Sequence, residues 1–258
     1  MKHIGIDGCK AGWFYIRFDE KGSYDFGVLN SIKELPQITN PNSIVCIDIP
    51  IGLRQKDTQE RLCDKEARKL LKKRGSSVFP APSRLSLDAS DYQAASGLNF
   101  KFTGRKLSRQ SHAISMKIKE VDDFIQTLEK QSYMRECHPE LCFLALNNFE
   151  PLNYSKKKKE GQAEREEILL NYLNSASKIV KEVSRKYLRK QVAIDDILDA
   201  MVAALTASFE GRVLTAPLQP EIDNRNLKME IVYPYLIQSM TEEKRVRILK
   251  KQSPLLKL

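Results

Sequence analysis

The run His3-Ile4-Gly5-Ile6-Asp7-Gly8 begins the chain with a short apolar segment that ends in a carboxylate. Residues 13–18 and 24–29 follow it and are rich in aromatic and aliphatic side chains, which favour strands. Residues 44–49 are an apolar run interrupted by a single aspartate, which is typical of a buried parallel strand. The pattern therefore predicts three strands joined by tight turns, followed by a fourth, parallel strand.

The remainder of the chain is predicted to be mostly helical. We expect helices at residues 54–74, 90–95, 113–128, 164–187 and 192–209, and further strands at residues 133–138 and 229–232. Residues 51–131 then form a largely helical insertion after the fourth strand. The predicted fold class is α/β, a mixed five-stranded sheet flanked by helices. The predicted domains are residues 1–210, with that insertion, and a C-terminal extension at 211–258 that packs on or beside it and carries a basic amphipathic tail at 242–251.

The composition indicates a soluble protein of a reducing compartment. No apolar run is long enough to cross a bilayer, and the first residues enter a strand directly, so we expect neither a membrane span nor an export signal. The five cysteines are odd in number, lack a C-x-x-C pair and fall within or beside apolar runs. This distribution favours buried thiols over a zinc site, and a cytoplasmic location.

The net charge of +10 is the second global feature. Such a charge favours polyanionic partners such as nucleic acid, although a solvated, lysine-rich surface would produce the same value. The charge by itself therefore leaves both interpretations open.

Four aspartates lie where a globular protein normally places apolar side chains: Asp7, Asp48, Asp196 and Asp199. A carboxylate buried without a partner is costly, so such groups are usually paired or bind a metal. Carboxylate oxygens are the ligands that Mg²⁺ and Mn²⁺ prefer. We therefore predict a divalent-metal site, formed from two strand ends and one helix, in a metal-dependent phosphodiesterase.

Each aspartate also has a purely structural interpretation. Asp7 is compatible with a turn before glycine, and Asp48 with a strand-end turn or a hydrogen-bonded buried carboxylate. Asp195 and Asp196 are each compatible with a helix N-cap. Asp199 falls in the next turn among apolar residues, where no cap is needed, and its D-x-x-D-A spacing places two carboxylates on one helix face. This helical pair is the strongest indication of a metal site.

These motifs, taken together, resemble a known family. The order of strand-aspartate, hairpin strands, second strand-aspartate and D-x-x-D-A on a late helix is similar to the ribonuclease H-like fold, especially RuvC-type resolvases. Longer stretches resemble the family known as domain of unknown function 429, described as predicted RNase H-like nucleases. The matching stretches are GIDGCKAGW at 5–13, IDIPIGL at 47–53, CD at 63–64 with AR at 67–68, SSVFPAP at 76–82, LSRQ at 107–110, ECHPE at 136–140, SKK at 155–157 with EG at 160–161 and Arg165, and DILDA at 196–200.

The resemblance implies a ribonuclease H-like sheet and a nuclease that hydrolyses phosphodiester bonds at a two-metal carboxylate site. Asp7 would bridge both ions, Asp48 would hold one, and Asp196 or Asp199 the other, with Glu136 as an additional ligand. The implied cofactor is Mg²⁺ or Mn²⁺ and the implied partner is nucleic acid, with DNA and RNA both open. Resolvases often act as dimers, which leaves a homodimer open.

Basic and hydroxyl side chains are the expected phosphate contacts, although the alternative for each charged run is a solvated surface. The candidates are Lys10, Arg68, Lys73, Arg74, Ser76, Ser77, Lys156 and Lys157. Lys156 and Lys157 belong to one of the matching stretches. His138 is expected to be a core or turn residue rather than a catalytic one, and Glu140 a further weak candidate ligand.

Two other functions remain compatible with the sequence. The turn Gly8-Cys9-Lys10-Ala11-Gly12 resembles the phosphate-binding turn of actin-like and sugar-kinase ATP-binding proteins, although those proteins use two such domains and this chain has one such turn. A non-catalytic nucleic-acid-binding protein that keeps a structural acidic cluster is the other alternative. Tight ATP binding without nucleic-acid binding would favour the first alternative. Substitution of Asp7 or Asp199 that alters folding stability but leaves nucleic-acid affinity and turnover unchanged would favour the second.

Overall fold

A computed structural model of the chain describes residues 2–128, 133–209 and 211–235. The described residues form two compact units. The first contains residues 2–48, 133–209, 211–214 and 232–235. The second contains residues 49–128 and 215–231. The predicted amphipathic tail at 242–251 lies outside the described residues.

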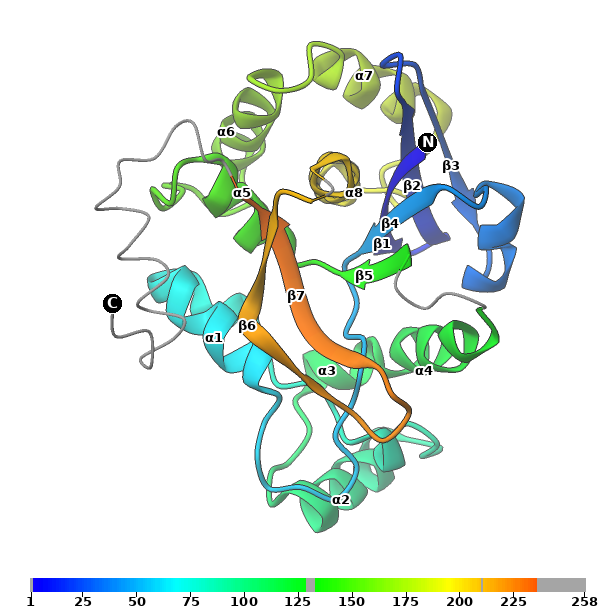
Figure 1. Cartoon of the computed structure of the whole chain (residues 1–258), viewed down its shortest axis with the longest axis vertical. Helices are drawn as coiled ribbons and strands as arrows, with labels where there is room; N and C mark the ends of the chain where they lie inside the picture. Colours follow the sequence, from blue (N-terminus) through cyan, green and yellow to red (C-terminus); the bar gives the residue numbers. More distant parts are fainter. Residues whose placement is uncertain (1, 129–132, 210, 236–258) are drawn as a thin grey trace. The chain divides into compact units, whose positions relative to one another are not determined.

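The first unit is built on a five-stranded mixed sheet (Figure 1). Its strands are β1 (Lys2–Cys9), β2 (Gly12–Asp19), β3 (Tyr24–Leu29), β4 (Ser43–Ile47) and β5 (Met134–Glu136), in the order β3-β2-β1-β4-β5. β1 pairs antiparallel with β2 and β2 with β3, whereas β4 lies parallel to both β1 and β5. This mixed sheet flanked by helices confirms the predicted α/β class. It is consistent with a ribonuclease H-like fold.

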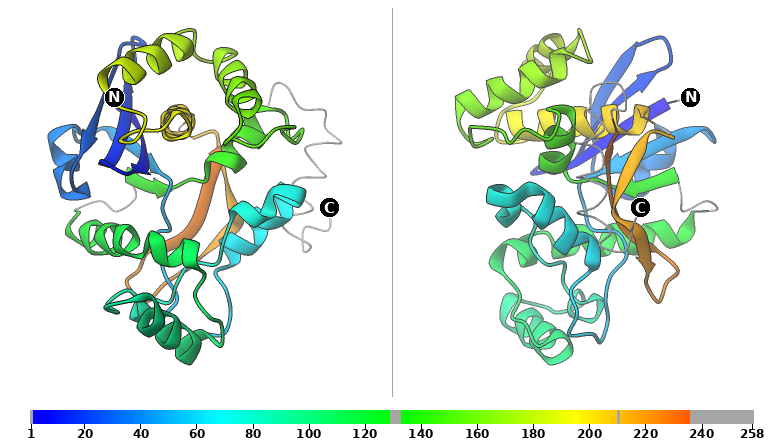
Figure 2. Two further views of the ribbon diagram at one scale, coloured as in Figure 1. Left: turned by 180° about the vertical axis from the view of Figure 1, so that it is seen from behind. Right: turned by 60° about the vertical axis from the view of Figure 1, so that its left-hand side comes forward.

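Helix α8 (Ile194–Ser208) is the central helix of this unit. It contacts β1, β2 and β4 on one side, and α5 (Pro139–Leu146), α6 (Lys159–Leu170) and α7 (Ala176–Lys186) on the others (Figure 1). The right-hand view of Figure 2 shows α8 along its length beside the strands. Its residues 197–204 are all buried, because sheet and helices enclose it. A helix that is apolar on all sides is expected only in such a position.

The helices before α8 differ from the prediction in two places. The expected helix at 164–187 is two helices, α6 and α7, because the chain turns between them and each packs against α8. Helix α5 was not predicted, since Pro139 was interpreted as the end of a strand. Proline is favoured in the first turn of a helix, where its missing N–H costs nothing. All residues of α5 are buried, so the segment has no amphipathic period.

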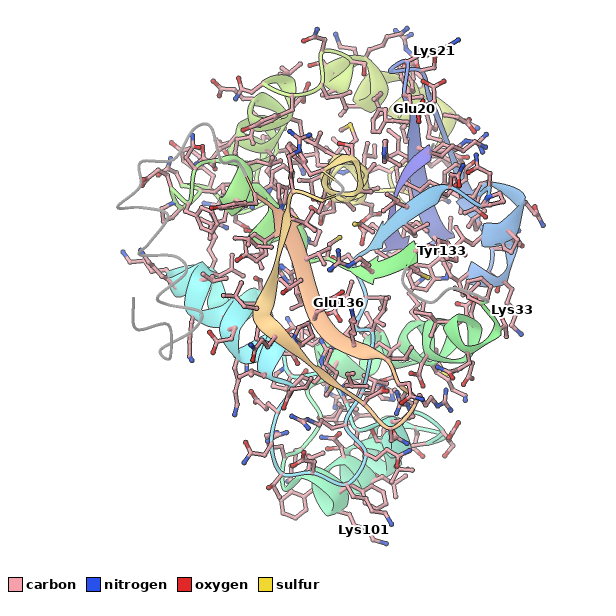
Figure 3. All side chains as sticks on the ribbon, in the orientation of Figure 1. Glu20, Lys21, Lys33, Lys101, Tyr133 and Glu136 are labelled. Carbon is pink, nitrogen blue, oxygen red and sulfur yellow. The ribbon has the colours of Figure 1, made fainter. Side chains whose placement is uncertain are left out.

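The connection between β3 and β4, residues 30–42, contains a 3-10 helix, η1 (Ile32–Gln37), and Ser31 caps it by accepting a hydrogen bond from the Lys33 amide at 3.2 Å. In Figure 3 the labelled side chains Glu20 and Lys21 mark the turn between β2 and β3. The turns that join β1 to β2 and β2 to β3 are short, so these three strands form one continuous antiparallel meander.

The second unit is largely helical, as predicted for the insertion. It contains α1 (Leu62–Leu71), α2 (Tyr92–Thr103), α3 (Arg109–Ala113) and α4 (Ser115–Phe124), with the 3-10 turns η2 (Lys72–Ser77), η3 (Arg84–Ser86) and η4 (Ile125–Thr127). Strands β6 (Val213–Ile222) and β7 (Lys228–Pro234) pair as a two-stranded ribbon. β7 confirms the strand expected at 229–232. β6 was not predicted, because it contains two prolines, which normally argue against a strand.

Among the described residues, none of the helices is long and apolar enough to cross a membrane.

Candidate functional site

Asp7 lies on β1, and Asp48 directly follows β4, which is the strand parallel to and beside β1. Ile6 of β1 pairs with Ile47 of β4, and the Asp48 amide donates a hydrogen bond to the Ile6 carbonyl at 3.0 Å. Asp48 therefore lies one residue beyond β4 rather than inside a strand. Asp7 lies within β1, opposite Phe14 of β2, rather than at a strand end. The positions differ from expectation because β1 continues to pair with β2 after β4 has ended.

Strand alternation places both carboxylates on the face of the sheet that α8 covers. Gly5 lies against Ala200 of α8 and pairs in register with Cys46 of β4. Asp7 follows Gly5 by two residues and Asp48 follows Cys46 by two, so both share that face. Asp7 is 9% exposed, whereas Asp48 is only partly buried. The site therefore has a solvent-accessible side at Asp48.

Helix α8 supplies a third carboxylate, from Asp199. Asp199 is 1% exposed and lies between the buried residues Leu198 and Ala200. Asp196 lies one turn earlier, and its Oδ2 accepts a hydrogen bond from the Ala193 amide at 2.8 Å. This contact satisfies one of the free N–H groups at the start of the helix. Asp199 thus faces the sheet, whereas Asp196 caps the N-terminus of α8.

Burial raises the pKa values of all three carboxyl groups, and repulsion from neighbouring carboxylates adds to the effect. The pKa of Asp7 is raised well above its ordinary value by burial first, and then by Asp48 and Asp199. Burial, with a contribution from Asp48, raises the pKa of Asp199 to about 7. Burial also raises the pKa of Asp48. The three groups therefore lie within electrostatic range of one another and favour a bound cation.

Lys156 supplies a positive charge to this cluster. Its Nζ donates a hydrogen bond to Asp199 Oδ2 at 2.6 Å. The Asp199 carboxylate raises the pKa of Lys156, and Asp7 and Asp48 add to the effect, against the opposing effect of burial. Lys156 therefore remains protonated at neutral pH. The sequence indicated this lysine as a phosphate contact, but its pairing with a residue 43 positions away was not predicted.

The chemistry of the cluster fits a hard divalent cation. Asp7, Asp48 and Asp199 offer carboxylate oxygens, the ligand type that Mg²⁺ and Mn²⁺ prefer. Among the described residues, Asp199 Oδ1 is buried and has no hydrogen-bond partner, which is costly for a carboxylate unless a cation joins it. In the same part of the chain, no three His, Cys, Asp or Glu side chains are arranged so that they could hold a metal ion as they stand. The carboxylate oxygens are therefore suitable metal ligands. In the structure as it stands, the Lys156 ammonium supplies the positive charge beside them.

Glu136, the additional ligand expected from the sequence, lies on the other face of the sheet. It ends β5 (Figure 3) and pairs in register with Ile47. Residues paired in register share a face, and Asp48 follows Ile47 by one residue, so the Glu136 and Asp48 side chains point to opposite faces. Burial raises the pKa of Asp48; His138 and Lys156 lower it, and Glu140 raises it.

Glu140 is held at the site by a buried arginine that the sequence did not single out as a site residue. Arg165 of α6 is fully buried and pairs with Glu140, and it also donates to the Gly161 carbonyl at 2.8 Å. Its guanidinium lies 5.5 Å from the centre of the Phe143 ring. Arg165 stands three and four residues before the buried Ile168 and Leu169. A charged side chain on the apolar face of a helix is the pattern that could have identified it.

The other predicted phosphate contacts fall in two places. Lys10 is exposed in the turn after β1, and Lys157 is exposed beside Lys156, so both belong to the first unit. The remaining candidates, on α1 and η2 of the second unit, are Arg68, Lys73, Arg74, Ser76 and Ser77. Arg68 pairs with Glu60 and donates to the Val78 carbonyl at 3.0 Å, so its charge is largely used within that unit.

A pocket of about 310 Å³ lies at the opposite end of the sheet face. It is lined by the start of β4, by β5 and by the last turns of α8, including Arg135 and Thr206. The carboxylate cluster is at the other ends of β4 and α8. The pocket and the cluster are therefore separate features of the first unit.

Comparison with known families gives one match. The family described as "Protein of unknown function (DUF429)" matches residues 5–222 of the chain. No curated protein and no solved structure matches the chain. The matched region includes all four aspartates, Lys156 and Arg165.

Proposed function

The chain belongs to the DUF429 family, and we propose that it is a metal-dependent nuclease that hydrolyses phosphodiester bonds of nucleic acid. The observation that carries the proposal is the convergence of Asp7, Asp48 and Asp199 on one sheet face, two of them buried, with raised pKa values and a single ammonium among them. Carboxylates gathered in this way serve hard divalent cations.

Asp7, Asp48 and Asp199 are the residues that would hold Mg²⁺ or Mn²⁺. Bound ions of this kind activate a water molecule for attack on a phosphodiester and stabilise the leaving oxygen. Asp7 would hold metal together with both Asp48 and Asp199, because these two carboxylates, and Asp196, all act on its pKa. Asp196 contributes by capping α8, which orients Asp199 in the following turn.

Basic side chains are proposed to bind the phosphates that flank the scissile bond. Lys156, Lys157 and Lys10 are the candidates in the first unit, and Lys73 and Arg74 are candidates in the second. The net charge of +10 favours association with a polyanion. Affinity for nucleic acid should therefore fall steeply as salt rises, because phosphate contacts release counterions. We also propose a cytoplasmic location, since all five cysteines are buried thiols.

The test is a cleavage assay on single- and double-stranded DNA, RNA, an RNA–DNA hybrid and a four-way junction. We expect cleavage of at least one substrate with Mg²⁺ or Mn²⁺ and none with EDTA. Asp7→Asn and Asp199→Asn should each lower the rate by roughly a thousandfold or more, because losing a metal ligand removes several kcal/mol of transition-state stabilisation. Nucleic-acid binding, measured with Ca²⁺ in place of Mg²⁺, should be retained.

The matched control is Glu167→Gln, which neutralises an exposed carboxylate on α6. It should cleave at the wild-type rate. Nucleic-acid binding without metal-dependent cleavage of any substrate would contradict the proposal and favour a non-catalytic binding protein. Tight ATP binding without nucleic-acid binding would contradict it in favour of a phosphotransferase-like protein.

A further inference from the structure

Asp199 is a buried carboxylate, and only one of its two oxygens accepts a hydrogen bond from a described residue. Oδ2 accepts from Lys156 Nζ at 2.6 Å, whereas Oδ1 is buried and has no hydrogen-bond partner among the described residues. The Asp199 side chain is 2% exposed and that of Lys156 is 34% exposed. One cation thus reaches the carboxylate from the solvent side, and one oxygen is left for a second ligand.

The backbone that carries Lys156 is tightly built. A Cβ atom on Gly161 would lie 2.0 Å from the Ser155 carbonyl oxygen, so the loop packs directly on the start of α6. Arg165 Nη1 donates to the carbonyls of Tyr154 at 3.3 Å and Gly161 at 2.8 Å and so fixes both ends of the loop. The position of the Lys156 backbone is therefore determined, while its long, flexible and partly exposed side chain can move its ammonium without a backbone change.

The charge balance favours exchange of this ammonium for a divalent cation. Lys156 offers one positive charge to three carboxyl groups, and a divalent ion offers two. An ammonium and a metal ion that shared Asp199 would repel each other across a few ångströms in a poorly solvated site. The two cations are therefore alternatives at this carboxylate.

We infer that Lys156 is the resident counter-ion of the metal-free site and competes with a divalent cation for Asp199. Metal binding then displaces the Lys156 ammonium from Asp199, which makes it available to an anion such as the phosphate of a substrate. The inference rests on the proposed function for its metal site. It adds that the Lys156 side chain couples two events: binding of a metal ion at Asp199 and release of the Lys156 ammonium to bind a phosphate.

The first experiment is a calorimetric Mn²⁺ titration of the wild type, Lys156→Met and Lys158→Met, with thermal melts in EDTA and in Mn²⁺. Removing the competing ammonium should tighten Mn²⁺ binding by about tenfold or more, equivalent to about 1.4 kcal/mol. Lys156→Met should melt lower than the wild type in EDTA and gain more from Mn²⁺. Lys158 is exposed on the same loop, so Lys158→Met is the control for metal affinity and should match the wild type.

The second experiment uses the wild-type protein, so it does not depend on the folding of a variant. Lys156 acylation by an amine-reactive reagent is followed by mass spectrometry with and without Mn²⁺. Displacement predicts faster labelling of Lys156 when Mn²⁺ is present, with labelling of the exposed Lys157 as the internal reference. Asp199→Asn should label rapidly at Lys156 even without metal.

The outcomes separate this inference from the proposed function. Mn²⁺ binding by the wild type with unchanged or weaker binding by Lys156→Met, or protection of Lys156 from labelling by Mn²⁺, would overturn the inference and leave the nuclease proposal standing. Mn²⁺ binding by Lys156→Met alone would support the inference. Absence of binding to either protein would overturn both.

Discussion

Gly5 of β1 lies against Ala200 of α8 with no side chain between the two backbones. A Cβ atom on Gly5 would lie 2.0 Å from the Ala200 carbonyl oxygen and 2.2 Å from the Ala204 nitrogen. Ala200 directly follows Asp199, and Gly5 precedes Asp7 by two residues. The same close approach that packs the helix on the sheet therefore sets the distance between the helix carboxylate and the strand carboxylates.

Gly5→Ala should destabilise the first unit by about 3 kcal/mol or more, because the added methyl group meets helix backbone that cannot rotate away. Urea denaturation measures the change. The control is Gly97→Ala in α2, where an added Cβ meets no described atom within 4 Å. That substitution should stabilise the protein by about 0.5–1 kcal/mol, since alanine is the better helix former. Equal effects of the two substitutions would show that the contact at Ala200 is not tight.

Arg165→Met should destabilise the protein by roughly 3–5 kcal/mol, because it removes the buried guanidinium that pairs with Glu140. The two side chains are 0% and 6% exposed. Glu140→Gln added to Arg165→Met should recover a large part of the loss, and a double-mutant cycle from urea denaturation measures this coupling. Lys178→Met removes the exposed pair of Lys178 with Glu182 and should cost no more than about 0.5 kcal/mol. Additive effects at Arg165 and Glu140 would contradict the prediction.

Arg84 should contribute as much to the stability of the second unit as Arg165 does to that of the first. Its Nε and Nη2 donate to the two oxygens of Asp122 at 2.8 and 2.9 Å, and Nη2 also pairs with Asp223. All three side chains are at most 6% exposed. Arg84→Met should destabilise by about 3–5 kcal/mol because two carboxylates lose a buried cation.

Arg84→Lys should restore only part of this stability, since an ammonium cannot reproduce the two parallel hydrogen bonds to Asp122. Thermal or urea unfolding of both variants provides the measurement. A lysine variant as stable as the wild type would show that charge alone, rather than the planar guanidinium, is required at Arg84.

The stability of the metal-free protein should depend on pH through Asp199, whose pKa is raised to about 7. An unfolded aspartate has a pKa of about 3.9. Between these values the folded state keeps a proton that the unfolded state releases, so this contribution to stability falls as pH rises, by roughly 1.4 kcal/mol per unit at most. It is fully present below about pH 4 and lost above about pH 7.

Asp199→Asn removes this contribution, so the wild type should lose stability relative to the variant as the pH is raised. Urea unfolding in EDTA at a series of pH values from mildly acidic to mildly alkaline measures the difference. Glu167→Gln should follow the wild-type curve, because its carboxylate is exposed. Parallel curves for the wild type and Asp199→Asn would contradict a raised pKa at Asp199.

The sequence by itself determined the five strands of the central sheet, the central helix and the identity of the acidic residues. β1 to β5 and α8 lie close to their predicted positions, because apolar runs, β propensity and tight turns act over a few residues. The aspartates could be singled out without a structure, since a carboxylate among apolar neighbours is unusual wherever the chain goes. The resemblance to the DUF429 family came from the same local stretches, and the family match agrees with it.

Only the tertiary structure decided which charges meet. Register alternation places Asp48 on the α8 face and Glu136 on the other, and strand pairing between distant segments sets that register. The Lys156–Asp199 pair joins residues 43 positions apart. The break between α6 and α7 likewise follows from packing against α8. Contacts of this kind depend on how surfaces fit together in three dimensions, which no local pattern in the chain encodes.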